Sequence, residues 1–153
     1  MTVRDVMTSE PVVVAPRTSL AEAAALMLAV DCGVLPVVDH DRLTGIVTDR
    51  DLFIALATRN VLASQLSLGE VARQEVWTCG PDDDVPAALD VMRRHQVRRL
   101  PVVDAAGHVV GIVSMNDILL TVGGSRAVAP RAVIDTLQQI GAHHHLPSRV
   151  EAP

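Results

Sequence analysis

The segment Leu35-Pro36-Val37-Val38-Asp39 occurs a second time in the chain, 65 positions later, as Leu100-Pro101-Val102-Val103-Asp104. At an offset of 66 positions, Gly45-Ile46-Val47-Thr48 returns as Gly111-Ile112-Val113-Ser114. A repeat of this length, with its parts in the same order, indicates two homologous copies in tandem. The predicted domains are a first copy (1–64), a second copy (65–123) and a C-terminal region (124–153).

Both copies predict the same order of elements: strand, helix, strand, strand, helix. The predicted strands are 12–14, 35–38, 43–47, 76–78, 100–103 and 109–113. The predicted helices are 20–29, 85–95, one from near 48 to 56 and one from near 114 to 122, with Ser19 and Asp84 as N-cap candidates. This order predicts a mixed α/β (α+β) fold, in which each copy has a small three-stranded sheet with helices on one side. Because a copy of this size buries little surface, we expect the two to pack about a pseudo-twofold axis, with paired clefts between them.

A further helix is predicted in the C-terminal region. Pro130 suits the first turn of a helix, and Gly141 suits its end. Val133, Ile134, Leu137 and Ile140 form its apolar stripe. The stripe packs either on its own protomer or on a partner chain, and we expect the residues from 142 onward to be loose.

Composition excludes several classes of function. All 13 basic residues are Arg, and the chain has one Phe, one Trp and no Tyr. The absence of Lys excludes P-loop and Schiff-base chemistry. Scarce aromatic side chains and a net charge of −5 argue against a nucleic-acid partner.

The sequence also predicts a compartment. No apolar run approaches the roughly 18–20 residues of a membrane span. The N-terminal residues 1–11 lack the basic and apolar stretches of a secretory signal. Cys32 and Cys79 match no metal or redox spacing. We therefore expect a soluble, cytoplasmic protein with no membrane partner.

Two short segments carry the clearest chemical signal. Thr48 and Ser114 each stand at a predicted helix start, where free backbone N–H groups attract phosphate. Asp51 and Asp117 follow three residues later, where a carboxylate can accept hydrogen bonds from a ribose diol. A capping box that only closes the helix start is the alternative interpretation. The duplication of the pattern favours ligand binding.

Together these segments resemble a tandem cystathionine-β-synthase (CBS) domain pair, also called a Bateman module. The resemblance rests on the two Leu-Pro-Val-Val-Asp segments, the two Gly-Ile-Val-Thr/Ser segments with their aspartates, and Val-Arg-Asp-Val-Met at 3–7. It implies β-α-β-β-α copies and clefts that bind AMP, ADP, ATP, NAD derivatives or S-adenosylmethionine. It also implies a homodimer, because such pairs usually meet edge to edge.

The resemblance implies site residues in both copies. Asp51 and Asp117 match aspartates that hold ribose hydroxyls, and Thr48 and Ser114 match hydroxyls near the ribose or phosphate. Further matched positions are Val13 and Thr78 at the adenine edge, and Cys32, Gly33, Val34, Arg98 and Arg99 before the Leu-Pro pairs; Arg50 is a candidate from its position beside Asp51.

In the family a cleft combines residues of both copies. One expected site joins Asp51 with Thr78 and Arg98, and the other joins Asp117 with Val13 and Val34. Arg98 and Arg99 suit a phosphate because guanidinium groups meet oxyanions in two-point geometry, although a solvated basic face is the alternative. We expect one cleft to bind tightly and the other weakly or not at all.

Other residues receive structural interpretations. We expect Trp77 in the core, His95 and His108 at the surface, and residues 82–84 to supply turn and cap groups or to meet a cation such as Mg²⁺ carried by a nucleotide. Cys32 is either a small buried residue or a redox-sensitive thiol. The His143-His144-His145 tract suggests no metal site.

The predicted function is a non-catalytic sensor with no obligatory cofactor, regulated by an adenine nucleotide. No nucleophile stands in a recognisable catalytic setting, so no enzyme activity and no catalytic residue are expected. The alternative is an interaction protein that acts on a partner enzyme or a transcription-linked partner protein without an obligatory nucleotide.

Overall fold

The computed structural model describes residues 1–124 and 128–142, which form two compact units. The terminal unit comprises Met1–Thr8, Trp77–Val102 and the described part of Ile112–Pro153. The central unit comprises Ser9–Val76 and Val103–Gly111. Both contain strands and helices, so the predicted mixed α and β fold with a C-terminal helix is confirmed.

The central unit is built on a β-hairpin with two helices. Its elements are α1 (Leu20–Ala29), β2 (Val34–Asp39), β3 (Arg42–Thr48), α2 (Asp49–Arg59) and the 3₁₀ turns Ala63–Gln65 and Leu68–Glu70. The strands pair antiparallel, with Val34 opposite Thr48 and a register irregularity between Val37 and Val38. His40 and Asp41 both have positive φ, 48° and 62°, as a tight two-residue hairpin turn requires.

A single apolar cluster fills the central unit. Its strand members are Val47 on β3 and two residues of the Leu-Pro-Val-Val run on β2, which is buried on nearly every residue, and its helical members repeat at intervals of three and four. The cluster consists of Val14, Leu20, Ala23, Met27, Leu35, Val37, Val47, Leu52, Ala55, Leu66 and Leu68. This packing holds the helix starts beside the strand ends, where the predicted site residues lie.

The start of α1 shows why local sequence sets the helix boundaries. Ser19 Oγ accepts from the Glu22 N–H at 3.2 Å, and Glu22 Oε2 accepts from the Ser19 N–H at 2.8 Å. These bonds satisfy two backbone donors that the first helical turn would leave unpaired. The Ser19 N–H bond is also the main reason that the pKa of Glu22 lies below its ordinary value. Helix α1 therefore begins and ends where the sequence predicts.

The terminal unit contains the second hairpin and three helices. Its elements are α3 (Val85–His95), α4 (Met115–Leu119) and α5 (Pro130–Gly141), preceded by the 3₁₀ turn Val3–Asp5. It also holds most of β4 (Arg99–Val103), the Ile112–Ser114 part of β5 (Val109–Ser114) and Thr8 of β1 (Thr8–Ser9), whose other residues belong to the central unit. The strand order is β1-β5-β4. The apolar face of α3 is buried as predicted through Val85, Ala88, Leu89 and Met92.

The N-terminal residues belong to the terminal unit. The Val3 N–H donates to the Asp83 carbonyl at 2.8 Å, and the Arg4 N–H donates to the Pro81 carbonyl at 2.9 Å. An exposed ion pair joins Arg4 to Asp82 at 3.0 Å. Val3 itself has no exposed surface. These contacts attach the start of the chain to the loop before α3.

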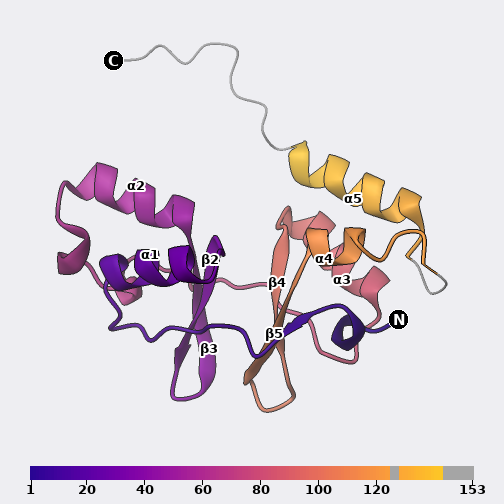
Figure 1. Cartoon of the computed structure of the whole chain (residues 1–153), viewed down its shortest axis with the longest axis horizontal. Coiled ribbons are helices and arrows are strands. Elements are labelled where there is room, and N and C mark those ends of the chain that lie inside the picture. The colour runs from indigo at the N-terminus through magenta and orange to yellow at the C-terminus, as the bar shows by residue number, and fades with distance from the viewer. Residues whose placement is uncertain (125–127, 143–153) are drawn as a thin grey trace, which may run out of the picture. The chain divides into compact units, whose positions relative to one another are not determined.

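Helix α5 packs on its own chain, against α3 and α4 (Figure 1). Val133, Thr136 and Ile140 are buried, whereas Ile134 and Leu137 are 54% and 41% exposed. The predicted stripe is therefore partly wrong. The face of the helix that carries residues 133, 136 and 140 packs against α3 and α4. The adjacent face, which carries Ile134 and Leu137, stays accessible.

The expected first strands are the other difference. Residues 12–14 and 76–78 form no regular strand, and pairing is limited to single parallel bridges, Val14 with Val37 and Cys79 with Val102. Both bridges lie beside the proline of a Leu-Pro pair, which accepts at its carbonyl but has no N–H to donate. Helix α4 is also shorter than predicted.

Within residues 1–124 and 128–142, no helix is both long and apolar enough to cross a membrane. The longest, α5, has 12 residues, fewer than the roughly 20 that a bilayer requires.

Truncation of a core residue tests the packing of the second repeat. Leu100, on β4, has no exposed surface, so Leu100→Ala is expected to lower the free energy of unfolding by about 2–5 kcal/mol. Leu120 is 86% exposed, and Leu120→Ala is expected to change it by less than about 0.5 kcal/mol. Urea unfolding followed by circular dichroism measures both. Equal effects would contradict the packing described.

Candidate functional site

The two predicted hydroxyl–aspartate segments form matching capping boxes. In the central unit, Asp51 Oδ2 accepts from Thr48 N–H at 2.9 Å and from Thr48 Oγ1 at 2.8 Å. In the terminal unit, Asp117 Oδ2 accepts from Ser114 N–H at 2.8 Å and from Ser114 Oγ at 2.7 Å. The capping interpretation is therefore confirmed for both segments. Each capping box uses only the Oδ2 atom of its aspartate, and Oδ1 takes no part in it.

The second carboxylate oxygen differs between the copies. Asp51 Oδ1 accepts from Arg73 at 2.8 Å (Nη2) and 3.2 Å (Nε). Asp117 Oδ1 has no hydrogen bond or ion pair with any residue that the structure describes. Arg73 therefore engages the second carboxylate oxygen in the first copy, whereas the equivalent oxygen of Asp117 has no partner among the described residues.

A pocket of about 350 Å³ lies in the terminal unit, beside the Ser114 capping box. Residues around the strand ends of the second copy form one side of it, and the last turns of α5 form the other. The lining residues are Arg98, Arg99, Ser114, Met115, Asn116, Leu137, Ile140 and Gly141. Three of the predicted site residues, Arg98, Arg99 and Ser114, are thus brought together.

A backbone hydrogen bond explains why these residues meet. The Met115 N–H, at the start of α4, donates to the Arg98 carbonyl just before β4 at 2.9 Å. The equivalent bond in the central unit runs from the Asp49 N–H to the Gly33 carbonyl at 3.2 Å. In each repeat this bond holds the residue before the Leu-Pro strand against the residue after the capping hydroxyl. The residue at the position before the strand, Gly33 or Arg98, therefore determines which chemical group lies beside the capping box.

The chemistry of the pocket suits an anion. Arg98 and Arg99 are exposed, and neither forms an ion pair with a described residue. Nearby Arg93, by contrast, is paired with Asp90 at 2.8 Å. Two guanidinium groups without ion pairs and the Asn116 amide provide donors that match oxyanion oxygens, whereas the Ser114 hydroxyl donates its hydrogen to Asp117. The buried Met115 and the α5 side chains add an apolar wall.

The other predicted site residues do not line this pocket. Thr78 and Asp117 lie in the terminal unit, with Asp117 reaching the pocket only through its bonds to Ser114. The remainder lie in the central unit: Val13, Cys32, Gly33, Val34, Thr48, Arg50 and Asp51. Their ligand-binding roles stay predictions.

Sequence reasoning missed two groups of lining residues. Leu137, Ile140 and Gly141 come from a helix that the sequence predicts but does not attach to the site. Met115 and Asn116 lie directly after Ser114, so their position beside the capping hydroxyl was a usable signal.

The expectation that Trp77 is a core residue is wrong. Trp77 is 37% exposed and stacks on the His95 imidazole, with ring centroids 3.4 Å apart and an interplanar angle of 12°. It follows a segment that forms no regular strand, so its ring covers the end of α3 instead of entering the sheet core.

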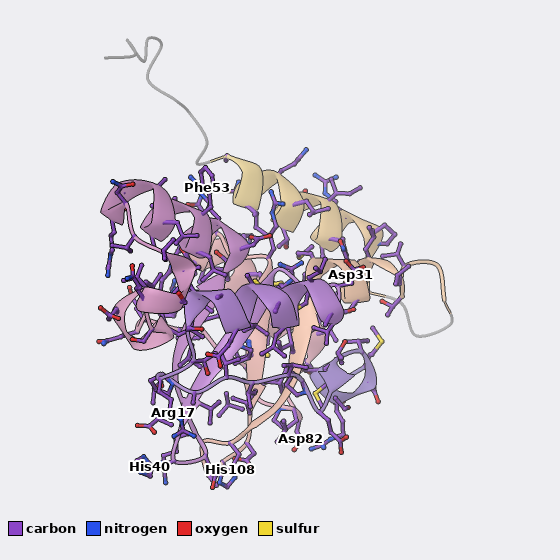
Figure 2. All side chains as sticks on the ribbon, turned by 60° about the vertical axis from the view of Figure 1, so that its left-hand side comes forward. Arg17, Asp31, His40, Phe53, Asp82 and His108 are labelled. Atoms are coloured by element: carbon purple, nitrogen blue, oxygen red, sulfur yellow. The ribbon has the colours of Figure 1, made fainter. Side chains whose placement is uncertain are left out.

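Titratable side chains at the turns have structural roles. His40 and His108 lie at exposed hairpin turns, and Asp82 lies in the exposed loop before α3 (Figure 2). The His108 N–H is the main cause of the lowered pKa of Asp104. Among the described residues no group of three or more His, Cys, Asp or Glu side chains is placed to hold a metal ion. The His143–His145 tract lies outside the described residues.

Comparison with known proteins identifies the family. A sequence model of the CBS domain matches residues 3–58 and 68–124. The chain belongs to the CBS domain family. The CBS domain-containing protein YhcV of Bacillus subtilis is 36% identical over 116 residues, which cover 76% of this chain and 81% of that protein.

Solved CBS domain structures resemble the chain as well. The CBS domain pair of protein MJ0100, in complex with 5′-methylthioadenosine and S-adenosyl-L-methionine, superposes with a TM-score of 0.72 at 31% identity and covers 80% of this chain and 100% of that one. CBSX2 in complex with AMP superposes with a TM-score of 0.68 at 28% identity, covering 78% and 93%. The CBS fold of this chain is thus shared with proteins whose ligands contain adenosine.

The buried thiol of the terminal unit provides a test of this geometry. Burial, with a smaller contribution from the Asp83 carboxylate, raises the pKa of Cys79 to about 12. Because the thiolate is the reactive form, iodoacetamide at about pH 8.5 is expected to leave Cys79 unmodified in the folded protein and to alkylate it in urea. Peptide mass spectrometry measures the modification, with Cys32 as internal comparison. Equal alkylation of Cys79 with and without urea would contradict the described burial.

Proposed function

We propose that this protein is a non-catalytic regulatory module that binds an adenosine-containing ligand with an anionic group, and that the terminal-unit pocket is its main site. The observation that carries the proposal is that two arginines without ion pairs to described residues, Arg98 and Arg99, line one pocket together with the Asn116 amide. Guanidinium forks bind phosphate oxygens by two parallel hydrogen bonds, which gives geometric specificity as well as affinity.

The apolar part of the pocket supports a nucleoside over a simple anion. Leu137, which is 41% exposed, offers aliphatic surface on which a base can be buried, backed by the buried Met115 and Ile140. The chain has no Tyr, and none of the lining residues is aromatic. We therefore propose that the base lies against aliphatic side chains.

The relatives narrow the ligand class. MJ0100 and CBSX2 are in complex with 5′-methylthioadenosine, S-adenosyl-L-methionine or AMP, which share an adenosine group. Among these, AMP carries the phosphate that Arg98 and Arg99 would meet. We propose AMP or a related adenine nucleotide as the first ligand to test, with no obligatory metal.

A regulatory role fits the pocket better than catalysis. The Ser114 hydroxyl donates to Asp117 in a capping box, and no His, Cys or Lys is among the lining residues. A nucleophile needs an adjacent base that accepts its proton in the reaction, and here the neighbouring carboxylate closes a helix start instead. Binding that stabilises the folded state is the output we propose.

Charge-selective binding tests the proposed function. AMP is expected to bind the full chain more tightly than adenosine, because only AMP has a phosphate for the arginines. Arg98→Gln is expected to weaken AMP binding roughly tenfold, as loss of a charge-assisted hydrogen bond does, and to affect adenosine much less. Isothermal titration calorimetry measures both ligands.

Arg94 provides the matched control. It is an exposed arginine of the same copy that does not line the pocket, so Arg94→Gln should bind AMP as the unmodified protein does. Failure of AMP, ATP and S-adenosylmethionine to bind would overturn the proposed function. Equal losses of AMP affinity in Arg98→Gln and Arg94→Gln would mean that Arg98 acts only through the overall positive charge of the protein and not by contact with the phosphate.

The exposed apolar side chains of the central unit support the alternative of an interaction protein. Phe53 projects from α2 and is 71% exposed (Figure 2), and Leu28 on α1 is 85% exposed. Large contiguous apolar patches often mark contact surfaces, and Phe53 and Leu28 are candidate members of such a surface. We propose a cytoplasmic homodimer that uses this surface.

Size-exclusion chromatography with light scattering tests the dimer. The measured mass should be twice the chain mass, and Phe53→Ser should lower the measured mass. A monomer at micromolar concentration would contradict the dimer.

A further inference from the structure

The C-terminal helix forms one wall of the pocket, although it lies outside both CBS domain matches. The matches end at residue 124, whereas Leu137, Ile140 and Gly141 belong to α5. Every other lining residue comes from the second repeat. The pocket is therefore a property of this chain's own C-terminal extension together with a CBS repeat.

Helix α5 is attached by a narrow apolar side. Val133, Thr136 and Ile140 are 1%, 3% and 2% exposed where the helix meets α3 and α4 (Figure 1). A hydrogen bond from Gln96 Nε2 to the Gln139 carbonyl, 3.1 Å long, adds a polar contact near the pocket end of the helix. Gln96 is the C-cap of α3 with φ 53°, so its backbone conformation is held by the end of that helix.

Two accessible apolar residues of α5 face different surroundings. Leu137 is 41% exposed and lines the pocket, one turn before Gly141. Ile134 is 54% exposed and does not line it. A ligand held by Arg98 and Arg99 would cover Leu137 and leave Ile134 in water, because only Leu137 shares the pocket with the arginines.

We infer that α5 is a ligand-contacting wall of the nucleotide site, and that ligand binding and the docking of α5 stabilise each other. The inference rests on the proposed function. Leu137 contributes the apolar surface for the base, and Ile140 holds the helix against the unit. A ligand that touches α5 only while the helix is docked favours the docked state, and by reciprocity a docked helix favours the ligand.

This arrangement gives the module a way to report occupancy. The pocket holds the anion between arginines of the second repeat, and the base contacts a separate element near the end of the described chain. Occupancy would therefore change the stability of α5 before it changes the hairpin core, which is buried independently of the pocket. A partner that senses α5 would sense the ligand.

Paired substitutions in the full chain test the inference, with AMP as the probe. Leu137→Ser is expected to raise the Kd for AMP roughly tenfold, because it removes the apolar contact to the base. Ile134→Ser makes the same chemical change on the same helix outside the pocket, and is expected to leave the Kd within about twofold. Hydrogen–deuterium exchange of the amides over 133–141 is expected to slow when AMP is bound.

The outcomes separate this inference from the proposed function. Absence of AMP binding to the unmodified chain overturns both. If Leu137→Ser and Ile134→Ser both bind AMP as tightly as the unmodified chain, and AMP does not slow hydrogen–deuterium exchange over 133–141, the role of α5 is overturned. The proposed function then stands. Equal losses in both variants would make the helix a structural support only and would also overturn the contact with Leu137.

Discussion

In each repeat, the chain passes from strand to helix at a hydroxyl residue that is tied to an aspartate three residues later. The bonds from Ser114 to Asp117 are short, and the adjacent Met115 N–H binds the carbonyl of Arg98. Two strands and a helix start are thereby held at one place. The pocket depends on this junction, because it brings the residue before one strand against the residues after the next.

The repeats share this junction but differ in charge. Asp51 is held by Arg73, and the residue bonded to the junction of the first copy is Gly33, which has no side chain. In the second copy the corresponding residue is Arg98, and one oxygen of Asp117 is available. The duplicated backbone therefore has the same geometry at this junction in both copies, while the position before the strand carries a cationic side chain only in the second.

Much of the fold could be predicted because it is encoded locally. The bounds of α1, α3 and α5 match the expected helices, and their starts are marked in the sequence by the Ser19 cap of α1 and by prolines in the first turns of α3 and α5. The predicted end of α4, near residue 122, lies beyond its observed end at Leu119. From Thr121 on, backbone N–H groups bind carbonyls three residues earlier instead of four, and Gly123 and Gly124, which disfavour helix, follow.

The parts that were missed depend on contacts between distant residues. Arg73 reaches Asp51 across 22 positions, and no pattern in the linker indicates this pairing. The packing side of α5 was only partly predicted, because a stripe of apolar residues does not say which neighbour the helix meets. The residues that line the pocket could be predicted where a repeat supplies them, as for Arg98 and Ser114, and could not where α5 does.

The central claim is that the second repeat and α5 together hold an adenine nucleotide. A crystal structure of the full chain with AMP tests it most directly. The account predicts AMP in the terminal-unit pocket, with its phosphate against Arg98 or Arg99 and its base against Leu137. AMP bound only at Thr48 and Asp51, or a pocket left empty at saturating AMP, would contradict it.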